Sequence, residues 1–299
     1  MISVFLEVVL PVALVAMLGG IIGRWRKVPV GPVSALTFYL FSPALVFHSM
    51  STTELSADVS FKIVAVMLVT YFVMLAASSV WSAVRGHDAS LRAGFALGAT
   101  TPNAGNMGLP VALLAFGDAA FDVAVMNFVA SAVLANSLGI AVASFSGGSR
   151  EEALRAPFRY PALYAAAAGV AVNVSGIDLP VTIASPVSSL ANAAVPTMLV
   201  VLGLQLQHMG TRDHVTDTIA VNLGRLIIAP AAAFLAAMLL GLDDLTRNTL
   251  VVLAAMPTAV IATILATEFR AQPAFVTRVG VTSTLASMVS LTLLISILR

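Results

Sequence analysis

The segment TTPNAGNMGLP, residues 100–110, holds the residue types best suited to bind a ligand inside an apolar chain. Proline removes a backbone donor and clashes with the preceding turn, and glycine adds freedom, so a helix is expected to break here. Within a membrane such a break is tolerated where it lines a cavity. The candidate substrate-binding residues in this segment are Pro102, Asn103, Gly105 and Asn106. The alternative is that the prolines only kink the helix and the asparagines join neighbouring helices.

A second interruption, Met256-Pro257-Thr258, occupies the matching place in the second half of the chain. Two interrupted helices would cross near the middle of a membrane and direct their broken ends at one site. The N-terminus of a half-helix carries partial positive charge, so that site would favour an anion. An ordinary kink is the competing interpretation here as well.

Pro43 and Pro196 also occupy equivalent places in two apolar segments, and Asn192 and Gln205 lie near the second of them. These residues either line the pocket or belong to kinks whose free backbone groups are satisfied by neighbouring helices. Gln205, near the inner end of its segment, could act as a gate or make an ordinary contact between helices.

Ionisable residues in or beside the apolar segments are scarce, and each is a functional candidate in a membrane. Asp58 and Lys62 are four residues apart and share a helix face, so they could form a protonation-sensitive latch or merely an exposed pair. Arg225 could extend to the cytoplasmic surface, which is slightly favoured, or balance a bound anion.

The elements that must position these residues are transmembrane helices. The chain has 299 residues, of which 59% are hydrophobic and 10% charged, whereas soluble domains carry about 25% charge. This composition excludes a soluble enzyme, and the apolar runs do not alternate as barrel strands would. An all-α polytopic membrane protein is predicted. Ten spans are expected at 2–22, 31–50, 61–84, 93–116, 122–144, 160–176, 183–207, 217–241, 248–269 and 278–298.

The charges predict the orientation and exclude several partners. Most of the 15 Lys and Arg residues fall in loops after odd-numbered spans, so the positive-inside rule places both termini outside the plasma (inner) membrane. A net charge of +1 provides no basic stripe for nucleic acid. The chain has no cysteine, phosphate-binding loop or metal-ligand spacing, so no cofactor and no metal are expected. Neither broken segment contains a carboxylate, which disfavours a sodium site.

An internal repeat divides the chain. The segment LPVALVAMLGG at 10–20 resembles YPALYAAAAGV at 160–170, and the proline-marked segments around residues 43 and 102 have counterparts around 196 and 257. The expected units are a first repeat at 1–145, a cytoplasmic linker at 146–159 and a second repeat at 160–299. Because five spans per half is an odd number, the repeats would be inverted, an arrangement that recurs in secondary transporters.

These motifs together resemble the auxin efflux carrier family, which contains plant PIN carriers and bacterial permeases assigned to malate or malonate. The resemblance covers essentially the whole chain. It is carried by PNAGNMGLP at 102–110, YP at 160–161, IDLP at 177–180, AVP at 194–196, LGLQL at 202–206, RL at 225–226 with Pro230, and AAMPTA at 254–259. Where many members have Asn-Pro before the sixth span, this chain has Tyr160-Pro161.

The resemblance implies ten helices in two inverted five-helix repeats, with the fourth and ninth crossing at their prolines. Spans 1, 2, 6 and 7 would form a scaffold that often dimerises, and spans 3–5 and 8–10 a mobile transport domain. Asn103 and Asn106 would hydrogen-bond a substrate carboxylate, and Asp58 with Lys62 would form a support site beside the pocket.

The function expected from these observations is secondary transport of a small organic anion, outward, by an elevator-type exchange of access. One alternative is a sodium-coupled organic anion symporter of the bile-acid symporter type. A second is a membrane sensor that binds its ligand without transporting it.

Overall fold

The computed structural model describes residues 1–144, 160–205 and 213–299, and the secondary structure of this part is helical throughout. The first half contains α1 (Ile2–Val4), α2 (Leu10–Arg26), α3 (Val30–Leu36), α4 (Ser42–Thr52), α5 (Ala57–Val84), α6 (Ala89–Thr100), α7 (Leu109–Phe116), α8 (Asp118–Leu134) and α9 (Ile140–Ser144). The second contains α11 (Pro161–Ser175), α12 (Val181–Gln205), α13 (Val215–Leu223), α14 (Ala229–Leu239), α15 (Asp244–Ala254), α16 (Val260–Glu268) and α17 (Pro273–Leu298). Wider π-helical turns join several of these: η1 (Phe5–Val9), η2 (Thr37–Phe41), η3 (Ala104–Gly108), η4 (Ala135–Gly139) and η6 (Gly224–Ile228).

Seven continuous helical segments of the described chain are long and apolar enough to cross a membrane. They run over Ile2–Arg26, Val30–Thr52, Ala57–Val84, Asp118–Val142, Val181–Gln205, Val215–Leu239 and Pro273–Leu298. Two shorter apolar helices, Ala104–Phe116 and Pro161–Ser175, accompany them. The prediction of an all-helical polytopic membrane protein is therefore confirmed.

Prolines explain most of the wider turns. The turns η1, η2, η3 and η6 each end two residues before a proline, at Pro11, Pro43, Pro110 and Pro230. Proline has no N–H for the usual bond four residues back and its ring clashes with that carbonyl, so the preceding turn widens. Pro43 thus sits in a continuous helix whose local geometry has adapted to it.

The helices at the two predicted breaks are interrupted. Between α6 and η3 the chain leaves helical geometry at residues 101–103, and between α15 and α16 it does so at residues 255–259. Each interruption leaves two short half-helices, so neither segment is among the seven long ones.

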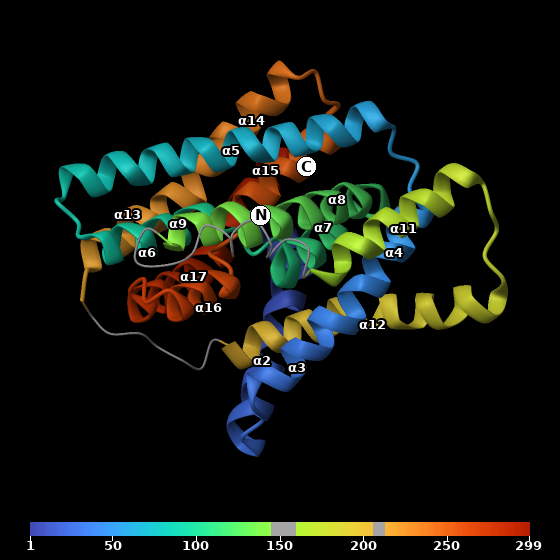
Figure 1. The fold of residues 1–299 in the computed structure, drawn as a ribbon, viewed down its shortest axis with the longest axis horizontal. Helices are drawn as coiled ribbons and strands as arrows, with labels where there is room; N and C mark the ends of the chain where they lie inside the picture. The colour runs from blue at the N-terminus through green and yellow to red at the C-terminus, as the bar shows by residue number, and fades with distance from the viewer. Residues whose placement is uncertain (145–159, 206–212) are drawn as a thin grey trace.

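The helices form two packed groups. In one, α2 packs against α12, and α4 against both α11 and α12. Gly203 permits the first contact, because a Cβ there would overlap the backbone oxygen of Ala16. In the other group, α5 packs against α6, α8 and α14, and α17 packs against α6 and α16. Figure 1 shows α5 lying across the second group, while α11 and the start of α12 extend to one side of the molecule.

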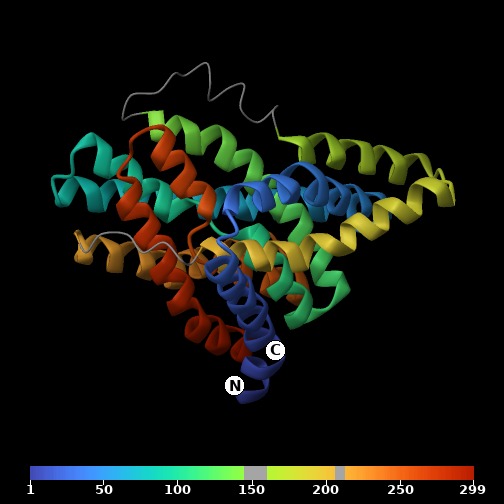
Figure 2. The same cartoon turned by 90° about the horizontal axis from the view of Figure 1, so that it is seen from below.

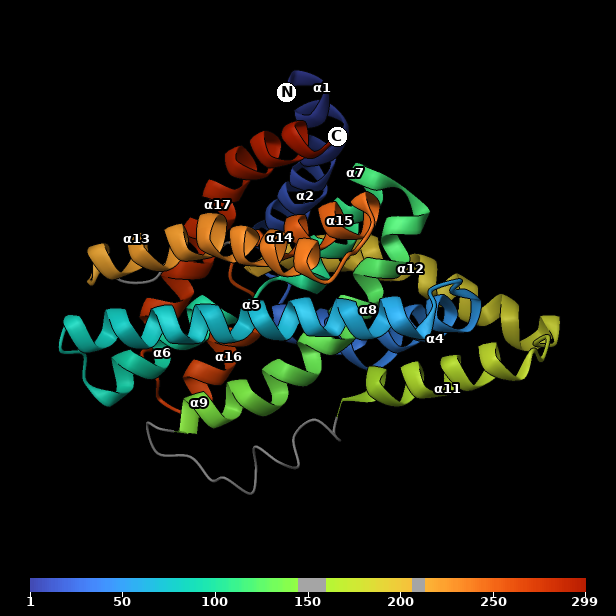
Figure 3. The same cartoon turned by 90° about the horizontal axis from the view of Figure 1, so that it is seen from above.

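The two chain ends lie together at one end of the molecule (Figures 2 and 3). The Arg299 Nη1 is 3.3 Å from the Glu7 Oε2, and its Nε donates to the carbonyl of Ala115 at the end of α7. Three segments far apart in sequence are therefore joined at this end.

Candidate functional site

The two helix breaks lie side by side and satisfy each other's backbone groups. The amide of Asn103 donates to the carbonyl of Pro257 at 2.8 Å, and the amide of Ala259 donates to the carbonyl of Thr101 at 2.9 Å. Pro102 and Thr258 thereby form an isolated antiparallel bridge. We call these paired segments, residues 101–103 and 255–259, the crossing. Polar backbone groups freed by the breaks would cost several kcal/mol if left unpaired in an apolar interior, and this pairing removes that cost.

Side chains complete the pairing at the crossing. The Thr258 hydroxyl donates to the carbonyl of Gly98 at 2.7 Å, and the Thr258 amide donates to the Ser283 hydroxyl at 3.1 Å. Thr258, Ser283 and their surroundings are buried. The broken ends are therefore fixed to α6 and α17.

Arg225 lies against other carbonyls of the two broken helices, which corrects the favoured expectation that its side chain extends to the membrane surface. Its guanidinium is buried, with 1% of the residue exposed, and donates to the carbonyls of Ala99, Ala254 and Met256 at 2.9–3.3 Å. A cation inside an apolar segment is buried when acceptors are available there, and broken helices supply them.

A cavity of about 360 Å³ lies on one side of the crossing. Asn103, Thr258 and Gln205 line it, so the structure brings together these three predicted binding residues. The remaining lining residues come from α3, α12, α16 and α17 and the crossing: Val30, Leu202, Ala259, Val260, Thr263, Thr277, Gly280, Val281 and Thr284. The four α17 residues in this list were not among the predicted binding residues, although their spacing of three to four residues places Thr277, Gly280 and Thr284 on one helix face.

Two buried polar atoms at this cavity have no partner among the described residues. They are the Asn103 Nδ2, a hydrogen-bond donor, and the Gln205 Oε1, an acceptor. Only 4% of Asn103 is exposed. Because buried polar groups are nearly always paired in native proteins, an unpaired donor and acceptor in two residues that line one cavity make these side chains the candidates to bind a polar ligand.

Two half-helices begin at this cavity. η3 starts after Asn103 and α16 starts after Ala259, and in the described structure neither of these N-cap residues makes a side-chain capping bond. The amides of Ala104 and Ala262 donate to the carbonyls of Pro102 and Ala259. Other first-turn amides have no intrahelical acceptor and carry the positive end of the helix dipole. Among the described residues, the lining contains no charged side chain. Together these features would bind a small anionic group through neutral donors.

Several other predicted residues lie elsewhere. Asn106 is half-buried and is not part of the cavity lining, Met256 is fully buried, and Gly105 packs against the ring of Phe128. Pro102 instead lines a separate cavity of about 40 Å³ on the Arg225 side of the crossing.

Of the residues predicted to line the pocket from the proline-marked helices α4 and α12, Gln205 does so and the others do not. Neither Pro43 nor Asn192 nor Pro196 lines either cavity, and the latter two are exposed. Matching positions between the two halves predicted which helices carry prolines, but not the rotation of each helix about its axis.

Asp58 and Lys62, the predicted support pair, form an ion pair but do not line the cavity of about 360 Å³. The Lys62 Nζ lies 2.8 Å from the Asp58 Oδ2, while 70% of the Asp58 side chain is exposed. Neither residue lines either cavity. Of the two interpretations, the structure shows the exposed pair.

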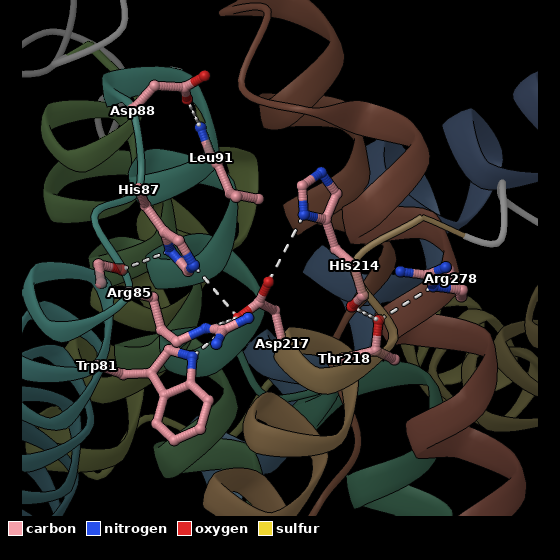
Figure 4. Close-up of polar contacts among 10 residues, drawn as sticks. Trp81, Arg85, His87, Asp88, Leu91, His214, Asp217, Thr218 and Arg278 are labelled. Atoms are coloured by element: carbon pink, nitrogen blue, oxygen red, sulfur yellow. Dashed lines mark hydrogen bonds and ion pairs between the residues drawn. The ribbon is translucent and has the colours of Figure 1, made fainter.

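A second polar cluster, which the sequence analysis missed, surrounds the buried carboxylate of Asp217 (Figure 4). Its Oδ1 accepts a hydrogen bond from the Trp81 Nε1 at 2.9 Å and lies 3.2 Å from the His87 Nε2 and 3.7 Å from the Arg85 Nε. Its Oδ2 lies 3.6 Å from the His214 Nδ1. We call these five residues the Asp217 cluster; it joins the end of α5 to the start of α13. The common feature in the sequence is that all lie at the ends of spans expected to face the cytoplasm.

Comparison with known proteins gives one family. The model of the family described as membrane transport protein matches residues 4–151 and 149–295. An uncharacterized transporter of Methanothermobacter thermautotrophicus is 29% identical over 292 residues, covering 96% of each chain. A second uncharacterized transporter, of Methanocaldococcus jannaschii, is 25% identical over 272 residues, covering 88% of this chain and 87% of that protein.

Proposed function

Because this chain belongs to the membrane transport protein family, the family of the auxin efflux carriers, we propose that it is a secondary carrier of small organic anions. The family is one of transporters, not enzymes, and the apolar helices make the chain a multi-pass membrane protein. The substrate class, the direction and the mechanism are the parts that the proposal adds.

The observation that carries the proposal is the unpaired Nδ2 of Asn103, a residue that lines a cavity at which two half-helices begin. A carboxylate there would accept from the side-chain Nδ2 of Asn103 and from unpaired first-turn amides of the two half-helices, in place of water. A hydrogen bond to a charged partner contributes about 1.5–3 kcal/mol, which is enough to select an anion over a neutral analogue. The apolar lining residues would receive the rest of the molecule.

The packing supports two inverted repeats at 1–145 and 160–299, with a linker at 146–159 that lies outside the described residues. Under this assignment span 6 of the second repeat corresponds to span 1 of the first, and span 7 corresponds to span 2. The pair of spans 1 and 7 (α2 and α12) therefore has its counterpart in the pair of spans 6 and 2 (α11 and α4), and both pairs are packed together. In the same way α5 packs on α6, and α14 on α15. The joined chain ends support a common side for both termini, and the positive-inside rule is the argument for the outer side.

The position of the cavity supports an elevator mechanism. Residues of α3 and α12 line one wall, and the crossing with α16 and α17 lines the other. If spans 1, 2, 6 and 7 form a dimeric scaffold, movement of the second group against it would carry the bound anion across. An interior negative by 100 mV favours the exit of a monoanion by about 2.3 kcal/mol, so outward transport needs no coupling ion.

The experiment is current measurement on a solid-supported membrane with the purified protein in liposomes. Malate, malonate, other short carboxylates and indole acetate would be applied to the wild type, to Asn103→Ala and to the control Asn192→Ala. Current for one of these acids, lost in Asn103→Ala and kept in Asn192→Ala, is the expected result. Equal current in both variants would place the site elsewhere. Binding without current would favour a sensor, and current only in sodium would favour a symporter.

A further inference from the structure

Arg225 contacts the C-terminal ends of two different half-helices. Its Nη1 donates to the carbonyl of Ala99 at 3.2 Å, near the end of α6. Its Nη2 donates to the carbonyls of Ala254 and Met256, both at 2.9 Å, at the end of α15, and its Nε lies 3.3 Å from the Met256 oxygen. One planar guanidinium thus spans both broken helices.

The charge of Arg225 is balanced by backbone dipoles. The C-terminus of a helix carries about half a negative elementary charge, so two such ends match one guanidinium. Among the described residues no carboxylate pairs with Arg225; the acceptors that contact it are these carbonyls. Without the guanidinium, three buried carbonyl oxygens from two negative helix ends would face one another.

Carbonyl oxygens of unwound membrane helices are also what hard cations use as ligands. In carriers with discontinuous helices, unwound carbonyls and half-helix C-termini coordinate the coupling sodium ion. Here the same kind of oxygen cluster is filled by a side chain of the protein itself, supplied by the wide turn η6.

We propose that Arg225 is the resident cation of the crossing, a positioning residue that holds the two breaks in register where a coupling metal cation would otherwise bind. Its consequence for transport rests on the proposed function; its consequence for the structure does not. The wild-type crossing accordingly takes no sodium or potassium ion.

The effect on the ligand cavity passes through adjacent backbone groups. Ala99 follows Gly98, whose carbonyl accepts from the Thr258 hydroxyl, and Met256 precedes Pro257, whose carbonyl accepts from the Asn103 amide. Release of the carbonyls bound by Arg225 would therefore shift Asn103 and Thr258, although Arg225 itself does not line that cavity.

The test is thermal unfolding of the purified protein in equal low concentrations of choline, sodium, potassium or guanidinium chloride, for wild type, Arg225→Ala and Met74→Ala. Met74 is a buried apolar side chain of α5, so its truncation controls for loss of volume without loss of charge. The cavity of about 40 Å³ beside Arg225 offers a free guanidinium ion a place to enter.

We expect the wild-type Tm to be the same in choline, sodium and potassium. Arg225→Ala should lower the Tm in choline by roughly 10 °C, because buried charge networks lose several kcal/mol when one partner is removed. Guanidinium should restore part of that Tm, while Met74→Ala should respond no better to guanidinium than the wild type does. A higher wild-type Tm in sodium or potassium than in choline would overturn the proposal. So would an Arg225→Ala protein whose Tm no cation raises.

A conservative variant keeps the test decisive if Arg225→Ala does not fold. Arg225→Lys keeps the charge but has one nitrogen in place of the fork, so it should fold with an intermediate Tm. A wild-type Tm in that variant would contradict the positioning role. Since none of these measurements needs a substrate, silence in the transport assay would count against the proposed function alone.

Discussion

The crossing and the Asp217 cluster are two polar regions of the described part of the chain, and they are built in opposite ways. The crossing pairs backbone groups of two broken helices, adds one guanidinium, and leaves the side-chain Nδ2 of Asn103, a residue that lines a cavity, without a partner among the described residues. The Asp217 cluster gathers the donors of four side chains around one carboxylate that is 3% exposed.

This difference separates a region whose carboxylate is surrounded by donors from one that has an unpaired donor beside a cavity, which we propose as the ligand site. A fully paired network in a low dielectric rigidifies the elements it joins, here α5 and α13. A network with one donor left over is completed only by something that enters the cavity. Substitutions in the two regions should therefore affect different measurements.

The largest expected effect is the loss of stability in Asp217→Ala. Removal of the carboxylate leaves Trp81, His87 and Arg85 without their common acceptor, which costs about 3–5 kcal/mol for a buried charged network. Thermal unfolding measures this loss. The concentration of anion that half-saturates the current should stay unchanged, because the cluster does not line the ligand cavity.

The exposed neighbour Asp213 supplies the control for this variant. Asp213→Ala should unfold within about 0.5 kcal/mol of the wild type, as surface substitutions do. If Asp217→Ala were no less stable than this control, the Asp217 cluster would not be the stabilising region of the pair.

The opposite pattern is expected for Asn103→Leu, which has a similar size and no donor. Binding of the transported anion should weaken by about 1.5–3 kcal/mol, or roughly tenfold to a hundredfold, because a bond to a charged group is lost. Stability should change little, since the Nδ2 has no partner to lose among the described residues. Tryptophan fluorescence during unfolding and current titrations, run on the same preparation, measure the two quantities. A large fall in Tm would show that Asn103 is structural.

A smaller and mixed effect is expected for Thr258→Val, which removes a hydroxyl that both lines the cavity and donates to Gly98. The Gly98 carbonyl then loses its partner, so unfolding should cost about 1–2 kcal/mol less. Current should also fall, because the two breaks are less firmly joined. Thr263→Val, at another lining residue, is the control and should affect stability by less. Equal effects of the two substitutions would show that the bond to Gly98 contributes little.

The helix breaks were predictable because their cause is local. A proline lacks its N–H whatever surrounds it, so the segments around Pro102 and Pro257 indicate a disturbed helix before any contact is known. Proline alone does not decide between a kink and a break, because the helices that contain Pro43 and Pro196 are continuous. The apolar composition likewise predicts an all-helical membrane protein, and the family confirms a transporter.

The partners of the polar side chains were not predictable because they depend on helices distant in the sequence. Arg225 contacts a carbonyl 126 residues away, and Asp217 accepts from Trp81 136 residues away. Helix rotation is set by packing in the same way, which is why Asn192 and Pro196 were assigned to the pocket and are found exposed. Net charge and residue spacing contain no information on these distant hydrogen-bond partners or on the rotation of a helix about its axis.

The smallest effect is expected at Asp243, which caps the far end of the half-helix α15 from the crossing. Its carboxylate accepts from the amide of Thr246 at 3.0 Å and from its hydroxyl at 2.6 Å. Partial burial raises the pKa of Asp243, but these hydrogen bonds outweigh it and hold the pKa below the ordinary value of 3.8. Asp243→Ala should lower stability by about 1 kcal/mol at neutral pH, as the loss of a helix cap does.

The pH dependence distinguishes this cap from the polar regions further inside. Because the pKa is lower in the folded protein, the stabilisation is complete above the unfolded pKa and is lost as the pH falls through the folded one. The Tm difference between wild type and Asp243→Ala should thus shrink below about pH 4. Asp244→Ala, which removes an exposed carboxylate 2.9 Å from Arg247, is the matched control and should change stability by less than about 0.5 kcal/mol. A Tm difference for Asp243→Ala that persists in acid would mean that the hydrogen bonds of the charged carboxylate do not stabilise α15. The position of α15 at the crossing would then depend on the contacts at its C-terminal end alone.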